Sequence, residues 1–209
     1  MFYKAVKRFF DVVVSLTGII IFLPLLLFVA VLIKLESKGP VIFKQDRLGL
    51  NGKVFKIYKF RSMCVGAEQG GVYEKKQDAR VTRVGKLIRK TSVDELPQFF
   101  NIIKGDMAII GPRPTLTYHP WPLEKYTEEQ KKRFNVRPGV TGLAQVNGRK
   151  DVLWEKRIEY DVEYVNKLSF SVDLKIFFKT IVKVLTMKDN INVAETVTAD
   201  KPSQVRPEE

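Results

Sequence analysis

The stretch VVVSLTGIIIFLPLLLFVAVLI, residues 12–33, decides how this chain is organised. It runs for 22 residues without a charge, which is long enough for a helix to cross a bilayer. A secretory signal peptide fits poorly, because the run is too long and no small-residue cleavage site follows it. A buried core helix would have to be apolar on every side, which is unusual. The stretch therefore predicts a membrane-inserted helix.

Pro24 interrupts this run near its middle, and basic residues flank the run on both sides. Proline removes a backbone hydrogen bond and kinks a helix. A straight span would place one basic flank outside, against the tendency of positive residues to stay inside. A helix that enters the membrane, breaks at Pro24 and returns to the same face satisfies both flanks, and a kinked span is the alternative. The flanking cations are Lys4, Lys7, Arg8, Lys34, Lys38, Lys44 and Arg47.

The residues that follow predict an α+β fold that is mainly helical. Residues 41–60 are typical of a β-hairpin, because segments rich in β-branched and aromatic residues flank Asn51-Gly52, a strong turn signal. Amphipathic helices suited to a membrane interface are also expected. The last helix carries lysines four residues apart, which fits either a solvated stripe or a surface lying on anionic lipid. The expected helices cover residues 81–90, 124–134, 154–168 and the chain from Ser171.

Two adjacent carboxylates, Asp94 and Glu95, lie within TSVDELPQ, residues 91–98, among basic residues. Such a pair suits a site for a phosphorylated substrate, where cations hold the phosphates and a carboxylate reacts or holds a metal. The spacing also fits a helix start. If Asp94 is the N-cap, Pro97 falls in the first turn, where its missing N–H costs nothing. We therefore expect a helix from near Asp94 to near Gly105. The spacing by itself favours N-capping as the role of the carboxylate, and the rest of the chain favours chemistry.

Composition restricts the chemistry further. The chain has one cysteine, Cys64, and one histidine, His119, which excludes an internal disulfide and supplies too few ligands for a His/Cys zinc site. A bound metal would be held by oxygen, which favours magnesium. The net charge of +13 indicates an anionic partner: nucleic acid, anionic lipid or phosphorylated small molecules. Arg113 in the rigid turn GPRP, with Gln145 and Arg149 in a glycine-punctuated loop, could bind phosphates.

Taken in order, the segments resemble bacterial sugar transferases of the monotopic phosphoglycosyl transferase type, in their minimal catalytic form. The resemblance implies transfer of a sugar-1-phosphate from a UDP-sugar to polyprenyl phosphate, usually undecaprenyl phosphate, with release of UMP. This reaction is the first membrane step in the synthesis of a glycoprotein or polysaccharide. The matching pieces are KRFFD (7–11), the Pro24-broken run, FKIYKFRSM (55–63), GKLIRKTSVDELPQFFNIIKGDM (85–107), GPRP (111–114) and RPGVTGLAQVNGR (137–149).

The resemblance also implies roles for residues. Asp94 would be the nucleophile that forms a covalent aspartyl phosphosugar, and Glu95 would help it to hold Mg²⁺. One departure is Leu23, where the family often has serine before the proline at the helix break. The hydroxyl of such a serine could donate a hydrogen bond to a backbone carbonyl that Pro24 leaves without its helical partner. The residues expected to bind substrate are Lys59, Arg61, Arg89, Arg113, Gln145 and Arg149.

These expectations divide the chain into a membrane-inserted re-entrant helix (1–38), a cytoplasmic catalytic domain with interfacial helices (39–188) and a disordered tail (189–209). They place it at the cytoplasmic face of the bacterial inner membrane. The expected partners are a UDP-sugar, undecaprenyl phosphate and membrane lipids, without nucleic acid, and a homo-oligomer or downstream glycosyltransferases are further candidates. A UDP-linked N-acetylated sugar, of which diacetylated bacillosamine is one example, is favoured as the donor, with galactose and glucose open. Two rivals are a non-catalytic membrane-anchored protein that binds nucleic acid or anionic lipid, and a phosphodiesterase using the same dyad with water.

Overall fold

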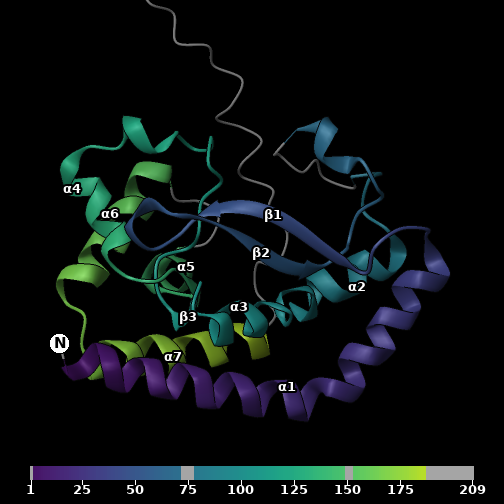
Figure 1. Ribbon diagram of the computed structural model, residues 1–209, viewed down its shortest axis with the longest axis horizontal. Coiled ribbons are helices and arrows are strands. Elements are labelled where there is room, and N and C mark those ends of the chain that lie inside the picture. The colour runs from purple at the N-terminus through teal and green to yellow at the C-terminus, as the bar shows by residue number, and fades with distance from the viewer. Residues whose placement is uncertain (1, 72–77, 149–152, 187–209) are drawn as a thin grey trace, which may run out of the picture.

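The computed structural model describes residues 2–71, 78–148 and 153–186, and its mainly helical α+β architecture confirms the predicted class (Figure 1). The predicted tail, residues 189–209, lies outside the described residues. The α-helices are α1 (Phe2–Glu36), α2 (Arg83–Lys90), α3 (Gln98–Lys104), α4 (Glu128–Lys131), α5 (Leu143–Asn147), α6 (Trp154–Asn166) and α7 (Phe170–Thr186). The strands are β1 (Ile42–Leu48), β2 (Val54–Phe60), β3 (Ala108–Ile110) and β4 (Gly139–Thr141).

Helix α1 is a single helical element that contains Pro24. In Figure 1 it runs along the lower side of the molecule and then turns upward toward α2. The expected break between two helices is therefore a bend within one helix. Proline removes one bond from the helical ladder, which accounts for a bend without ending the helix.

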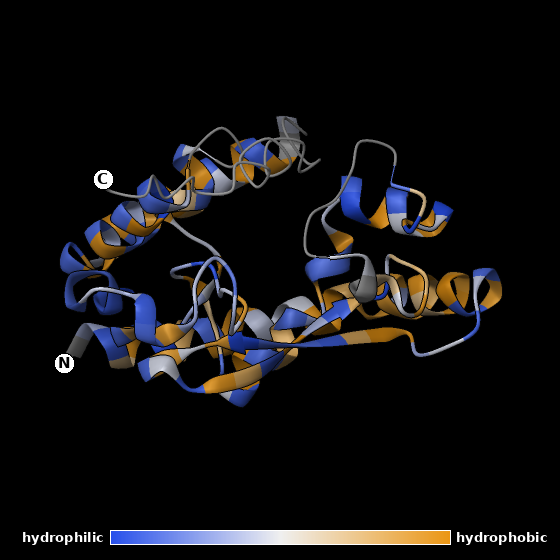
Figure 2. Cartoon of the chain, turned by 90° about the horizontal axis from the view of Figure 1, so that it is seen from above, coloured by the Kyte–Doolittle hydropathy of each residue, from blue (hydrophilic) through white to orange (hydrophobic). Residues whose placement is uncertain are grey.

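The apolar stretch of α1 is largely exposed. Only 17% of its most apolar 18-residue window is buried inside the protein, so the alternative of a soluble core helix does not hold. Figure 2 shows hydrophobic residues along the part of α1 that leads into β1. Within the described residues, α1 is the one helix long and apolar enough to cross a membrane.

Both ends of α1 bond to the folded domain that follows it. Near its start, the Arg8 guanidinium donates to the carbonyls of Ile102 and Ile103 at 2.6 and 3.0 Å. At its end, the Glu36 carboxylate accepts a hydrogen bond of 2.7 Å from the backbone N–H of Arg83, at the start of α2. The two ends of the long helix are thus attached to one domain.

A buried polar network strengthens the first of these attachments. Asp173 in α7 accepts hydrogen bonds from the hydroxyls of Tyr3 at 2.6 Å and Tyr164 at 2.7 Å. The Lys7 ammonium lies 2.9 Å from the same carboxylate. The first turns of α1 are therefore held against α6 and α7.

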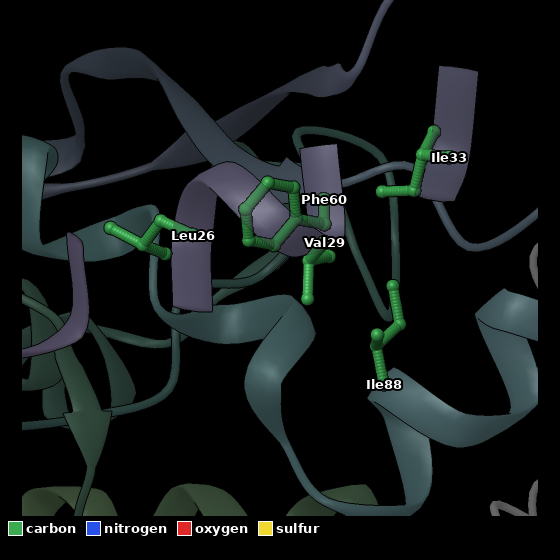
Figure 3. Packing of buried hydrophobic residues seen from close by; sticks show 5 residues of the cluster. All are labelled: Leu26, Val29, Ile33, Phe60 and Ile88. Atoms are coloured by element: carbon green, nitrogen blue, oxygen red, sulfur yellow. The ribbon is translucent and has the colours of Figure 1, made fainter. Parts of the chain in front are cut away.

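The second half of α1 packs on the domain through side chains. Leu26, Val29 and Ile33 form a buried cluster with Phe60 of β2 and Ile88 of α2 (Figure 3). These three α1 residues lie three to four positions apart, so they share one face of the helix. That face is buried, while neighbouring faces stay exposed.

The β-hairpin expected at residues 41–60 is confirmed. Strands β1 and β2 pair in antiparallel fashion, with Ile42 opposite Phe60. In the connection, Asn51 has a φ of 55° and Gly52 a φ of 72°. Asparagine and glycine tolerate this left-handed region better than other residues, which explains why Asn51-Gly52 signals the turn.

A second small sheet corrects the expectation of a loop at residues 137–149. Strands β3 and β4 pair in parallel, with Ala108 opposite Gly139 and Ile110 opposite Thr141. The chain then continues into α5. Each strand has three residues, too few to show the alternation that predicts a strand.

The helix predictions hold for α2, α6 and α7, whose bounds lie within about two residues of the expected ones, as boundary assignments generally do. The segment 124–134 differs, because it forms α4 between 3-10 turns at Leu123–Lys125 and Lys132–Asn135 instead of one helix. Lysines of α7 reach α5: Lys179 donates to the Asn147 side chain at 3.2 Å and Lys183 to the Gln145 carbonyl at 3.3 Å.

Candidate active site

The two adjacent carboxylates lie in a 3-10 turn, Val93–Glu95, between α2 and α3. Ser92, which precedes the turn, has a φ of 59°, and neither end of the turn carries a side-chain capping bond. Helix α3 begins at Gln98 with Pro97 in the N-cap position. The expected helix start near Asp94 is therefore wrong, and so is the capping role. The predicted end at Gly105 is confirmed, with a φ of 100° there.

The Asp94 side chain is buried, with 9% of the residue exposed. Among the residues that the structure describes, its carboxylate has no hydrogen-bond or ion-pair partner. Burial, together with the negative charge of Glu95, raises the pKa of Asp94 to about 6, although the positive charges of Lys59, Arg89 and Arg113 act to lower it. The result is an unbonded carboxylate among cations, and it is ionised at neutral pH.

The Glu95 carboxylate has different surroundings. It accepts a hydrogen bond of 2.8 Å from the Lys59 ammonium, and the Arg113 guanidinium lies 3.8 Å away. Lys59 is on β2, and Arg113 follows β3. Glu95 is therefore in contact with cations from two segments that are far apart in the chain. Two neighbouring carboxylates in unlike environments suit different chemical tasks.

Arg113 stands on a turn whose backbone is held on several sides. The carbonyls of four consecutive residues, 112–115, each accept a hydrogen bond of 2.9–3.1 Å. Such a turn presents the Arg113 side chain from a fixed backbone. The donors are, in order, the N–H of Gly139, the guanidinium groups of Arg133 and Arg47, and the N–H of Leu48.

Two glycines allow the close approach of this turn to β4. A Cβ placed on Gly111 would lie 2.4 Å from the Arg137 carbonyl oxygen, and one on Gly139 would lie 2.1 Å from the Gly111 nitrogen. Real Cβ atoms essentially never approach backbone so closely, so only glycine fits at either position.

The remaining predicted substrate-binding residues are Arg61, Gln145 and Arg149. Arg61 is buried, and it donates to the carbonyls of Lys38 at 2.5 Å and Ser37 at 2.7 Å, just after α1. It therefore holds the end of α1 and is not brought to the dyad. Gln145 is buried beside the Gly111 turn, and neither of its amide atoms has a partner among the described residues. Arg149 lies outside the described residues.

Sequence reasoning missed Arg133 and Asp161. They form a buried ion pair at 2.6 Å, and Arg133 also donates to the Arg113 carbonyl. Nothing in the sequence singles out these two residues, because charged side chains are common in both of their segments.

The dyad offers two carboxylates to a metal ion. Among the described residues, no group of three or more His, Cys, Asp or Glu side chains could hold one. Mg²⁺ commonly binds one or two carboxylates together with water and substrate phosphates. The residues therefore fit a magnesium ion that is shared with a phosphorylated substrate.

Comparison with known proteins gives the family of this chain. The family model described as bacterial sugar transferase matches residues 2–187. An uncharacterized sugar transferase, EpsL, from Bacillus subtilis is 43% identical over 93% of this chain and 94% of its own length.

The names of two longer relatives state the reaction that they catalyse. A UDP-glucose:undecaprenyl-phosphate glucose-1-phosphate transferase from Klebsiella pneumoniae is 47% identical over 85% of this chain. A UDP-N-acetylgalactosamine-undecaprenyl-phosphate N-acetylgalactosaminephosphotransferase from Aeromonas hydrophila is 47% identical over 88%. The chain spans 39% and 44% of the length of these two relatives. The match over residues 2–187, with the dyad and its cations inside it, shows that this chain belongs to the bacterial sugar transferase family.

Proposed function

We propose that this protein is a phosphoglycosyl transferase that moves a sugar-1-phosphate from a UDP-sugar to undecaprenyl phosphate and releases UMP. The observation that carries the proposal is the buried Asp94 carboxylate, which is unbonded among the described residues and lies among Lys59, Arg89 and Arg113. The named reactions of the Klebsiella and Aeromonas relatives support it. Their names differ in the sugar, so the donor here is a UDP-sugar whose sugar the family alone does not specify.

The site supports a transfer in two displacements. In the first, an Asp94 oxygen attacks the sugar-bearing phosphorus of the UDP-sugar, and the bond from that phosphorus to the oxygen of UMP breaks. In the second, an oxygen of undecaprenyl phosphate attacks the same phosphorus, and the bond to Asp94 breaks. The lipid then carries the sugar on a diphosphate, and the Asp94 carboxylate is free again.

The cations around the dyad offset the charge that accumulates during each displacement. Lys59 and Arg113 already contact Glu95, at 2.8 and 3.8 Å, so they are preorganised for phosphate oxygens. Mg²⁺, held by Asp94 and Glu95 with phosphate oxygens of the donor, would supply further positive charge for the departing UMP. Gln145 and Arg149 are proposed to bind the donor as well. Arg61 is left out of this set because its guanidinium holds the end of α1.

The attachments of α1 support a re-entrant arrangement at the cytoplasmic face. At 1.5 Å per residue, the 35 residues of α1 extend about 50 Å, yet Arg8 and Glu36 near its two ends bond to one domain. A domain with no other candidate span among its described residues lies on one side of the membrane. Both ends of α1 then lie on that side, where UDP-sugars are made. A non-catalytic basic anchor is not favoured, because it does not require the dyad.

The test is whether UDP-sugar alone loads the enzyme. Purified protein is mixed with Mg²⁺ and each UDP-sugar in turn, and intact-protein mass spectrometry should show a sugar-phosphate adduct with one equivalent of UMP released. Undecaprenyl phosphate should then remove the adduct and form the lipid-linked sugar. Asp94→Asn is the matched control and should show neither adduct nor turnover. Transfer without an adduct would argue for direct displacement, and UMP release without a lipid product would identify a phosphodiesterase.

A further inference from the structure

Behind the turn that carries Arg113 lies a buried ion pair between Arg133 and Asp161 of α6. Their side chains are 2% and 3% exposed. The Asp161 carboxylate accepts hydrogen bonds from Nη2 of Arg133 at 2.6 Å and from Nε at 3.1 Å. The Arg133 guanidinium also lies over the ring of Phe134, 5.2 Å from its centre. Asp161 and this ring therefore fix the plane of the guanidinium.

The N–H groups that Asp161 leaves free are directed at the turn. Nη2 of Arg133 donates to the Arg113 carbonyl at 2.9 Å, and Nη1 lies 3.4 Å from the Thr115 hydroxyl. One guanidinium thus joins α6 to the backbone of Arg113, whose own side chain reaches toward Glu95.

A buried ion pair by itself is weak evidence for a gain in stability, because removing two charges from water costs about as much as their attraction returns. The direction of the remaining Arg133 bonds suggests another use. We propose that Arg133, held by Asp161, is a positioning residue that fixes Arg113 for binding the diphosphate of the UDP-sugar. This inference rests on the proposed function and adds a group that does not touch the substrate.

The proposal predicts that Arg133 acts through Arg113, which a double-mutant cycle measures. Arg133→Lys keeps the charge beside Asp161 but has too few donors in a fixed plane to serve Asp161 and the turn together. The readout is the dissociation constant for UDP with Mg²⁺, by calorimetry on the full chain, beside KM and kcat for UMP release. Arg133→Lys should weaken UDP binding by about tenfold, the loss expected for one hydrogen bond from a charged donor. In an Arg113→Ala background, the same change should weaken it by less than about twofold.

Arg61→Lys is the matched control, because Arg61 is also buried and also donates to backbone carbonyls, but at the end of α1. It should lower the melting temperature and leave the affinity for UDP within about twofold, since it breaks no hydrogen bond to the turn. If Arg133→Lys does not fold, Asp161→Asn enters the same cycle with the same expectation. Equal weakening of UDP binding in both backgrounds, or a lower melting temperature with unchanged binding, would overturn the positioning role. Absence of UDP binding to the wild-type protein would instead overturn the proposed function, and this inference with it.

Discussion

Asp94 and Glu95 are adjacent in the chain, but the fold gives their carboxylates unlike surroundings. Glu95 contacts Lys59 and Arg113, whereas the Asp94 carboxylate has neither a hydrogen bond nor an ion pair among the described residues. A nucleophile needs a free lone pair, and a carboxylate already engaged by a lysine is a poorer one. The geometry therefore favours Asp94 for attack and Glu95 for holding the cations and metal in place.

The raised pKa of Asp94 predicts the pH dependence of the first displacement. Because burial raises that pKa to about 6, kcat/KM for the UDP-sugar should fall as the pH drops through about 6, by about tenfold per pH unit below it. Initial rates of UMP release between pH 4.5 and 8 measure this acid limb. A limb near pH 4, where an ordinary aspartate titrates, would contradict the assignment.

The same pKa predicts an effect on stability. Folding raises the pKa of the Asp94 carboxyl, so between pH 3.8 and about 6 the folded state binds more protons than the unfolded state. The free energy of unfolding therefore falls as the pH rises through this range, and the loss is complete above it. Asp94→Asn removes this cost and breaks no capping bond. At pH 7.5 it should be as stable as wild type or more stable, by an amount of the order of 2 kcal/mol. The difference should vanish near pH 4, as chemical denaturation at several pH values would show. A variant less stable than wild type at pH 7.5 would mean that the carboxylate has a structural bond.

At the scale of elements, the small parallel sheet is what joins the Arg113 turn to the rest of the domain. Gly111 and Gly139 approach so closely that a Cβ on either would overlap the other's backbone region. The N–H of Gly139 also donates to the Pro112 carbonyl at 2.9 Å. This sheet is therefore part of the site although none of its side chains has a proposed chemical role.

We expect Gly139→Ala to separate β4 from the turn. The added methyl has no space, so the backbone must shift. The expected loss in the free energy of unfolding is about 3 kcal/mol, as for an extra carbon atom forced into a well-packed core. Affinity for UDP should fall together with stability, because Arg113 moves with the turn. Gly66→Ala is the control: Gly66 has a φ of 82° but nothing within 4 Å of an added Cβ, so it should lose about 1 kcal/mol and keep its affinity. Normal UDP binding in Gly139→Ala would show that the close approach is dispensable.

At the scale of the whole molecule, the domain holds α1 at both ends. The network of Tyr3 and Lys7 around Asp173 fixes one end, and Glu36 and Arg61 fix the other. Between these attachments most of the apolar surface of α1 is exposed, apart from the face that packs on the domain, as expected of an element in contact with lipid. The bend in α1 is what allows a helix of this length to meet one domain twice.

This arrangement predicts the topology. In intact cells of a Cys64→Ser background, cysteines placed singly at Lys4 and Lys38 should both resist a membrane-impermeant thiol reagent until the cells are opened. Pro24→Ala restores the helical ladder and straightens α1, so one end must leave the domain, and the Lys4 site should begin to label from outside. Labelling of that site in the wild-type protein would mean that α1 spans the bilayer. Unchanged protection in Pro24→Ala would show that the attachments at the two ends hold the bend without proline.

Local patterns were sufficient for much of this protein. The uncharged run predicted α1, Asn51-Gly52 predicted the hairpin, helical spacing predicted α2, α6 and α7, and the dyad stood out by its charge among cations. These features depend on residues a few positions apart, whose side-chain periodicity and backbone preferences are visible in one segment.

Only the tertiary structure decided the features that depend on distant segments. Arg8 meets Ile102 across 94 positions, and Arg133 meets Asp161 across 28. Arg61 and Arg113 are both arginines close to a strand end, yet one holds a helix and the other reaches the dyad. The sequence does not show which group a charged side chain will contact, because that contact depends on how the folded backbone brings distant segments together. For that reason the family and the main helices could be predicted from the residues, while the partners of the charged side chains could be seen only in the fold.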